Sequence, residues 1–209
     1  HRYRTDVQAL RSFLKTGELG PVQAIRCGWY MFRPTGQVAG WRQQRARSGG
    51  GAVLDLGLSL VDLALWVSGC PVPRRVDAVL TRDEGAEVED AGCALITCQG
   101  GVSIFMDVSR RYVGDQERFW FDATGARGSA SIHPLRIFKE VHGIPTNVAP
   151  TGASGREDAF TASYRAEWAH FLAIARGQIA RPDLADQLIL HRTLEAIYRS
   201  ADEGRDVTL

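Results

Sequence analysis

The middle of the sequence alternates apolar and polar residues with a period of two, and its segments are joined by very short connections. This alternation is typical of strands with one buried face. Glycine-containing turn signals lie at 99–101 and 125–128, between consecutive segments. Connections this short join antiparallel neighbours, because a parallel pair needs a crossover of a dozen residues or more. The sequence therefore predicts a largely antiparallel sheet with strands at 75–82, 91–98, 101–109, 117–124, 128–133 and 136–141.

Helical patterns precede and follow these strand segments in the sequence. Apolar residues recur at helical spacing, and residues 22–31 are typical of one more strand. Segments 33–48 and 143–158 are rich in glycine, proline and polar residues and are predicted to be loops. The expected fold class is α+β, an open, largely antiparallel (mixed) sheet with helices packed on one face. The predicted helices span 3–16, 52–67, 160–176 and 183–203, and the third has an apolar stripe of Tyr164, Trp168, Phe171, Leu172 and Ala175.

The second face of the predicted sheet also has aromatic side chains. The run at 117–124 places Phe119 and Phe121 on the opposite face from Trp120. Helices cover one face, so Trp120, Phe105 and Trp29 need another cover, which a second copy of the chain supplies. The alternative is that they are scattered surface aromatics. We expect a homo-oligomer, dimer or tetramer, formed through the open face.

Composition excludes several classes of protein. The 209 residues are 44% hydrophobic and 23% charged, as in ordinary globular proteins. A net charge of +1 gives no electrostatic reason to expect nucleic acid or a membrane surface as partner. The four cysteines form no C-x-x-C pair and have no histidines at ligand spacing. We expect no metal site, and free thiols in a reducing compartment, the cytoplasm. The cysteines are Cys27, Cys70, Cys93 and Cys98.

The helix at 52–67 follows three glycines and is apolar apart from one stripe. Asp55, Ser59 and Asp62 lie at i, i+4 and i+7, so they share one face and interrupt a run that otherwise approaches membrane-spanning length. Charged side chains are rarely buried without partners, so this stripe is expected to face a cleft or ligand. Gly57 and the glycines at 49–51 suit close approach of other groups.

A structural interpretation of the same stripe stays open. Asp55 lies where a carboxylate caps helix N–H groups, and Ser59 can bond back to the carbonyl of residue 55. Asp62 can pair with an arginine of the 42–47 cluster.

The order of short motifs resembles the C-terminal domain of the Gfo/Idh/MocA oxidoreductases, the glucose–fructose oxidoreductase and inositol dehydrogenase family. The similarity runs through the whole chain, and it lies in the order and spacing of the motifs. They are R-x-x-x-x-V-Q-x-L-R…G-x-L-G at 4–20, W-R at 41–42, G-G-G-A-V-L-D-L-G-x-x-x-x-D at 49–62, E-D at 89–90, G-x-x-G at 125–128, E-W-x-x-F at 167–171 and A-I-Y-x-S-A-x-E-G-R-x-V at 196–207.

The resemblance implies a two-domain enzyme. Residues 1–209 would form its single C-terminal substrate-binding and oligomerisation domain, and an N-terminal Rossmann domain, absent from this chain, would bind NAD or NADP. His1 starts inside a helical pattern, which fits the back part of a longer protein. No G-x-G-x-x-G follows a strand, so the chain alone is not expected to bind a dinucleotide well.

The resemblance also assigns candidate site residues. The family's helix motif is Asp-x-x-x-His, whose histidine exchanges protons with substrate together with an N-terminal lysine. Asp55 matches the aspartate, but Ser59 stands at the histidine position. Serine has no pKa near neutrality, although it can orient a hydroxyl or a water. Trp41 and Arg42 match a Trp-Arg near the cofactor and substrate, and their alternative is a solvated loop.

Three outcomes follow from Ser59. The first is that the lysine of the N-terminal domain acts as the base. The second is that another group of this domain replaces the histidine, and the third is that oxidoreductase activity is lost. The chain's other histidines are weak replacements, because a lone histidine is no motif; they are His133, His142, His170 and His191.

Two functions are therefore expected. The first is a domain of an NAD(P)-dependent dehydrogenase acting on a CH–OH group of a sugar, inositol or related polyol, with Asp55 and Ser59 catalytic and Trp41 and Arg42 binding substrate or cofactor. The second is a non-catalytic small-molecule-binding or scaffolding homologue that has lost the histidine.

Overall fold

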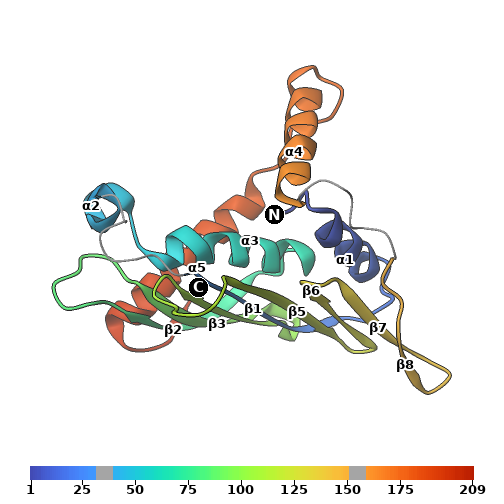
Figure 1. The fold of residues 1–209 in the computed structure, drawn as a ribbon, viewed down its shortest axis with the longest axis horizontal. Coiled ribbons are helices and arrows are strands. Elements are labelled where there is room, and N and C mark those ends of the chain that lie inside the picture. Colours follow the sequence, from blue (N-terminus) through green and yellow to red (C-terminus); the bar gives the residue numbers. More distant parts are fainter. Residues whose placement is uncertain (32–39, 151–158) are drawn as a thin grey trace.

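One broad sheet with helices above a single face makes up the computed structural model (Figure 1). The structure describes residues 1–31, 40–150 and 159–209. Residues 32–39 and 151–158 lie outside the described residues, and with them positions 33–39 and 151–158 of the two predicted loops. The expected α+β class with a mixed, open sheet is confirmed.

The sheet has nine strands in the order β8-β7-β6-β5-β1-β4-β3-β2-β9. Among these described strands, β1 and β4 pair in parallel and every other neighbouring pair is antiparallel. The short connections therefore formed antiparallel neighbours, as expected. The strands are β1 Val22–Tyr30, β2 Pro73–Thr81, β3 Ala91–Cys98, β4 Ser103–Ser109, β5 Arg118–Gly125, β6 Gly128–Ile132, β7 Arg136–Val141, β8 Ile144–Asn147 and β9 Val207–Thr208.

The helices that cover the sheet come from distant parts of the sequence. In Figure 1, α1, α3 and α5 lie over one face, whereas α4 stands away from the sheet. The helices are α1 Thr5–Lys15, α2 Arg45–Ser48, α3 Leu58–Val67, α4 Ala159–Ala175 and α5 Ala185–Glu203, with a 3-10 turn η1 Gly40–Gln43 and a π-helical turn η2 Val53–Gly57 that leads directly into α3.

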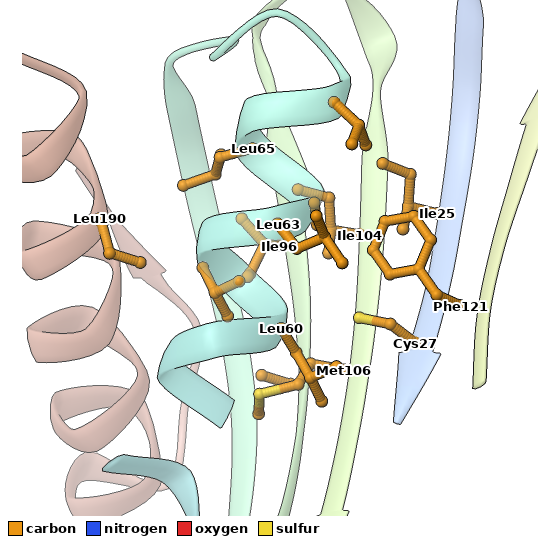
Figure 2. Packing of buried hydrophobic residues seen from close by; sticks show 14 of the residues in the cluster. Ile25, Cys27, Leu60, Leu63, Leu65, Ile96, Ile104, Met106, Phe121 and Leu190 are labelled. Atoms are coloured by element: carbon orange, nitrogen blue, oxygen red, sulfur yellow. The ribbon is translucent and has the colours of Figure 1, made fainter. Parts of the chain in front are cut away.

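The core lies between α3 and the middle of the sheet (Figure 2). Leu60 and Leu63 of α3 point toward Ile104 and Met106 of β4, and all four are fully buried. Phe121 comes from β5, which lies next to β1 on the side opposite β4. Its ring is fully buried and extends the core in that direction. Burying side chains of this size contributes about 1.5–3 kcal/mol each. This packing fixes α3 and leaves its other face available for chemistry.

Several sequence-based expectations about the fold were wrong. The predicted loop at 143–158 contains β8, which forms a hairpin with β7. Trp29 lies on the helix-covered face, where its ring contacts Phe119, so it needs no cover on the open face. The stripe of α4 is not core, because Trp168 is 62% exposed.

The apolar run around α3 is longer than its sequence pattern suggested. Among the described residues, the helical stretch Arg45–Val67 has 23 residues and is, by length and composition alone, long and apolar enough to cross a membrane. Of its most apolar window, 67% is buried inside the protein. A core helix packed on a sheet has the same length and composition, and α3 is such a helix.

Candidate functional site

The start of the α3 helical stretch is held by a single buried side chain. Glu89, 1% exposed, accepts hydrogen bonds at Oε1 from the backbone N–H groups of Gly51 (2.8 Å) and Val53 (3.0 Å). Its carbonyl oxygen accepts from the N–H of Ala52 at 2.9 Å. Three consecutive amides, which a helix N-terminus leaves without intrahelical acceptors, are thus satisfied by one residue.

Two further side chains hold Glu89 in place. The Tyr198 hydroxyl, from α5, donates to Glu89 Oε1 at 2.8 Å. Arg110, which directly follows β4, donates to the Glu89 carbonyl at 2.9 Å. Burial, together with the adjacent Glu89 carboxylate, raises the pKa of Tyr198, so this hydroxyl keeps its proton and remains a donor. The clamp formed by Glu89, Tyr198 and Arg110 ties three parts of the fold to one helix end.

The triple glycine makes room for this clamp. A Cβ at Gly51 would overlap the Glu89 carbonyl oxygen, and one at Gly50 would overlap the Tyr198 hydroxyl. Close approach of other groups was predicted at these glycines, and the groups that approach are the Glu89 carbonyl and the Tyr198 hydroxyl. Gly57 similarly faces Met106, where a Cβ would lie 2.7 Å from the sulfur.

Asp55 lies in the π-helical turn that this clamp positions. Its N–H donates to the Gly51 carbonyl at 2.9 Å, and its side chain is exposed on the face of the helix away from the sheet. Single π-helical turns inside α-helices are rare and occur frequently at functional sites. The position of Asp55 therefore depends directly on the residues bound to Glu89.

A pocket of about 210 Å³ brings Asp55 together with two of the other predicted site residues. Trp41 and Arg42 come from η1, and the Arg42 guanidinium lies 4.8 Å from the centre of the Trp41 ring. Arg110 lines the same pocket and is 4% exposed. Its Nε has no hydrogen-bond partner among the described residues. The pocket thus combines one carboxylate, two guanidinium groups and an indole.

This set of groups suits a ligand rich in hydroxyl groups. The Asp55 carboxylate accepts hydrogen bonds from hydroxyls, and guanidinium groups donate to oxygen acceptors. The indole of Trp41 provides a flat apolar surface beside them. Small-molecule sites commonly combine an apolar surface with a few convergent polar groups.

The other two members of the polar stripe lie outside this pocket. Ser59 Oγ donates to the Leu56 carbonyl at 2.9 Å, not to the carbonyl of residue 55 as the structural interpretation supposed. Asp62 was expected to pair with an arginine of the 42–47 cluster, and this was wrong. It pairs with Arg2, whose Nε and terminal nitrogen donate at 2.9 and 2.5 Å. Asp62 therefore ties the start of the chain to α3.

The four histidines considered as replacements all lie elsewhere in the described part of the chain. His170 Nδ1 is 3.0 Å from the Tyr3 hydroxyl, and His133 Nε2 is 2.8 Å from an Arg4 nitrogen. Burial and the charge of Arg4 lower the pKa of His133. His142 and His191 are exposed. None of them lines the pocket that contains Asp55.

The cysteines of the described ranges are not arranged for redox or metal chemistry. All four cysteines are free thiols, with Cys27 and Cys98 buried and the other two half-buried. Burial raises the pKa of Cys98 to about 11, so this thiol is unreactive at neutral pH. Within residues 1–31, 40–150 and 159–209, no group of three or more potential ligands lies close enough together to hold a metal ion.

The fold and the pocket define the class of protein. It is an α+β domain whose sheet has helices on one face, an uncovered second face, and charged groups on the helix layer. The sequence matches the family described as GFO/IDH/MocA C-terminal domain over residues 7–131. The chain therefore belongs to this family, as its motifs indicated. The matched residues include Trp41, Arg42, Asp55 and Ser59, as well as Glu89.

Individual relatives are oxidoreductases. The chain is 32% identical over 126 residues to a proposed UDP-kanosamine synthase oxidoreductase subunit of Amycolatopsis mediterranei (strain S699), over 52% of this chain and 35% of the relative. It is 23% identical to the D-glucoside 3-dehydrogenase of Escherichia coli (strain K12), over 100% of this chain and 63% of the relative.

A solved structure shares the fold. Levoglucosan dehydrogenase, in complex with NADH and levoglucosan, superposes with a TM-score of 0.82 at 21% identity, over 99% of this chain and 64% of that chain. The chain thus spans between about one third and two thirds of the length of the relatives that it matches.

Proposed function

We propose that residues 1–209 form the substrate-binding and oligomerisation domain of an NAD(P)-dependent oxidoreductase acting on a CH–OH group of a sugar, inositol or related polyol. The observation that carries this proposal is the pocket in which Asp55 lies beside Trp41, Arg42 and Arg110. A carboxylate accepts hydrogen bonds from substrate hydroxyls and can take part in proton transfer. The similarity to sugar oxidoreductases supports the substrate class.

The described residues fit one wall of a cofactor and substrate site. A dinucleotide-binding fold is built from successive parallel β-α-β units, whereas the one parallel pair described in this chain is β1 with β4. Asp55, Trp41 and Arg42 are exposed, so a second domain can approach them. A nicotinamide supplies hydride transfer when it is bound. The role of Asp55 is to bind and orient the hydroxyl whose carbon is oxidised.

Ser59 favours a second candidate, a non-catalytic homologue that binds a small molecule. Its hydroxyl is bonded to the Leu56 carbonyl, and no histidine lines the pocket in the described part of the chain. The first candidate requires a proton acceptor from outside these residues, and an N-terminal lysine is the one we propose. Ser59 then orients a substrate hydroxyl or a water.

Ser59→His tests the two candidates in the full-length protein. An imidazole one helical turn from Asp55 restores a group that titrates near neutrality, so we expect kcat on a panel of polyols to rise about 10²-fold, and to increase further as the pH passes through about 6.5. Ser59→Asn is the matched control, because it is polar but has no proton acceptor in this range. Absorbance of the reduced nicotinamide is the measurement. Inactivity of both variants and of the wild-type protein on every polyol would support the non-catalytic homologue.

The open face of the sheet supports oligomerisation with a second copy. Leu95 and Phe105 are paired across β3 and β4, and both are exposed on this face, together with Val79 of β2. Trp120 of β5 is half-buried on the same face. Monomeric proteins rarely expose contiguous apolar patches of large side chains.

The double substitution Leu95→Glu and Phe105→Glu is expected to dissociate the full-length oligomer. Two carboxylates would be buried without partners at the subunit contact, which is strongly unfavourable. Light scattering coupled to size-exclusion chromatography measures the mass. Val113→Glu, in an exposed loop, is the control and should keep the wild-type mass. An unchanged mass in the double variant would rule out this face as the contact.

Localisation in the cytoplasm completes the proposal. The four free cysteines support a compartment in which thiols stay reduced. The candidate partners are then a small hydroxyl-rich substrate and a second copy of the chain.

A further inference from the structure

Arg110 is a buried cation whose charge is incompletely paired. It is 4% exposed, and its Nη2 donates to the Glu89 carbonyl at 2.9 Å. Its contact with Asp90 Oδ1, at 3.5 Å, is at the outer limit of a hydrogen bond. Nε has no hydrogen-bond partner among the described residues. A guanidinium has five N–H donors, and an uncompensated buried charge is strongly unfavourable, so Arg110 is suited to one further anionic partner.

The acidic side chains of the β2–β3 connection are bonded elsewhere. A second hollow is lined by Arg110 together with Asp83 and Glu87 of this connection. Asp83 pairs with Arg111, and Glu87 Oε2 accepts a hydrogen bond from the N–H of Arg45 at 2.8 Å. These two carboxylates therefore have partners of their own and leave the charge of Arg110 available to a ligand.

The pocket that contains Asp55 has an excess of positive charge. Arg110, at the end of β4, and Arg42, in η1, both line it. Asp55 is the one carboxylate among the described residues of its lining. A neutral polyol leaves this excess charge in place, whereas an anionic group on the ligand balances it.

We propose that this pocket binds a sugar derivative with an anionic oxygen group, a carboxylate or a phosphate. Arg110 and Arg42 bind the anionic group, and Asp55 accepts a hydrogen bond from a hydroxyl of the same molecule. Guanidinium groups pair with carboxylates and phosphates through two parallel hydrogen bonds, each roughly twice as strong as one between neutral groups. The inference rests on the proposed function for the reaction, and it narrows the substrate class from sugars and polyols in general to anionic sugars.

Asp55 favours the substrate over the cofactor as the source of the anionic group. The phosphates of a dinucleotide would lie close to the Asp55 carboxylate in so small a pocket, and like charges repel each other at this range. A sugar acid or sugar phosphate presents a hydroxyl to Asp55 and its anionic group to the arginines. The two groups of such a molecule are only a few bonds apart, which suits a pocket of about 210 Å³. Arg110 and Arg42 are then specificity-determining residues.

Equilibrium binding to the full-length protein tests this proposal without turnover. The probes are matched sets built on glucose, galactose and mannose, and each set contains the neutral hexose, its uronate and its 6-phosphate. Isothermal titration calorimetry, with and without a nicotinamide cofactor, gives the Kd of each probe. In at least one set we expect an anionic probe to bind about 10–100-fold more tightly than the neutral hexose, the usual contribution of a hydrogen bond to a charged group. The tighter of the two anionic probes identifies the group as carboxylate or phosphate.

Arg42→Gln removes one guanidinium from the pocket and leaves the helix clamp intact. The Kd of the preferred anionic probe should rise about tenfold, while the Kd of the neutral hexose stays within about twofold. Arg110→Gln should abolish the same preference. Because Arg110 also bonds to Glu89, the thermal transition of this variant is recorded to separate lost binding from lost stability. Arg47→Gln is the matched control, since Arg47 is exposed in α2 and does not line the pocket.

Three results would overturn the proposal. Equal Kd values for neutral and anionic probes, or no binding of any probe, would mean that the arginines bind no substrate anion. An unchanged preference in Arg42→Gln and Arg110→Gln would place the anionic group elsewhere. Weaker binding of the cofactor as the only effect of these substitutions would assign the arginines to its phosphates.

The proposed reaction can fail separately from this inference. A protein that prefers the anionic probes but transfers no hydride would overturn the dehydrogenase and keep the ligand class. Turnover of neutral polyols without a preference for anionic probes would keep the dehydrogenase and overturn the ligand class.

Discussion

Replacing Glu89 with alanine is expected to lower the free energy of unfolding of this domain by about 3–5 kcal/mol, because it leaves three donors unsatisfied and each one that is buried costs about 1–3 kcal/mol. The variant leaves the amides of Gly51 and Val53 and the Tyr198 hydroxyl without their acceptor in a buried site. It also removes a negative charge from the positive end of the helix dipole. The thermal transition of the full-length protein, measured by calorimetry, should fall by roughly 10 °C.

Two control variants distinguish the loss of the hydrogen bonds from two other effects. These are the loss of the charge and any general effect of a substitution in the β2–β3 connection. Glu89→Gln keeps an acceptor oxygen for the same amides, so it should cost about 1–2 kcal/mol. Glu84→Ala removes an exposed carboxylate from the same β2–β3 connection and should change stability by less than about 0.5 kcal/mol. If Glu89→Ala were as stable as Glu84→Ala, the clamp would not hold the helix end.

Local sequence signals predicted most of the elements correctly, because strand and helix periodicities depend on neighbouring residues. The strand containing Phe119 and Phe121 and the helix containing Leu60 and Leu63 were both expected from such patterns. The hairpin strand β8 was missed, since its four residues lie between glycine- and proline-rich segments that resemble a loop.

Contacts between distant residues could not be predicted in this way. Asp62 and Arg2 are separated by 60 positions, and Glu89 lies 38 positions after Gly51. The Glu-Asp motif at 89–90 and the paired arginines at 110–111 were the available signals for the clamp, but neither signal specifies a partner.

The face on which an aromatic side chain lies is equally ambiguous in a sequence. Trp29 alternates correctly with its neighbours, yet its strand gives no indication of which face the helices cover. The stripe of α4 has the pattern of a core helix, and burial against this domain or against another one gives the same pattern.

If the full-length protein is the proposed oxidoreductase, Asp55→Ala is expected to reduce its kcat/KM by about 10²–10⁴-fold, the usual contribution of a positioned acid–base or orienting group. The side chain is exposed on the helix and lines the pocket with Trp41 and Arg42. Removing it takes away the group that we propose to orient the substrate hydroxyl. The hydrogen bond from the Asp55 N–H to Gly51 is unaffected, so the fold should be retained.

The same substitution distinguishes a catalytic role from a structural one. A structural Asp55 would lower the thermal transition, whereas the proposed role predicts lost turnover with a transition within a few degrees of the wild type. Asp55→Asn keeps an acceptor oxygen but not the charge, so it should lose less turnover than Asp55→Ala, because a neutral amide oxygen binds a substrate hydroxyl more weakly than a carboxylate does. Initial rates with a saturating nicotinamide cofactor and a calorimetric scan of each variant provide both measurements. Turnover near the wild-type level in both variants would show that the pocket carboxylate takes no part in the reaction.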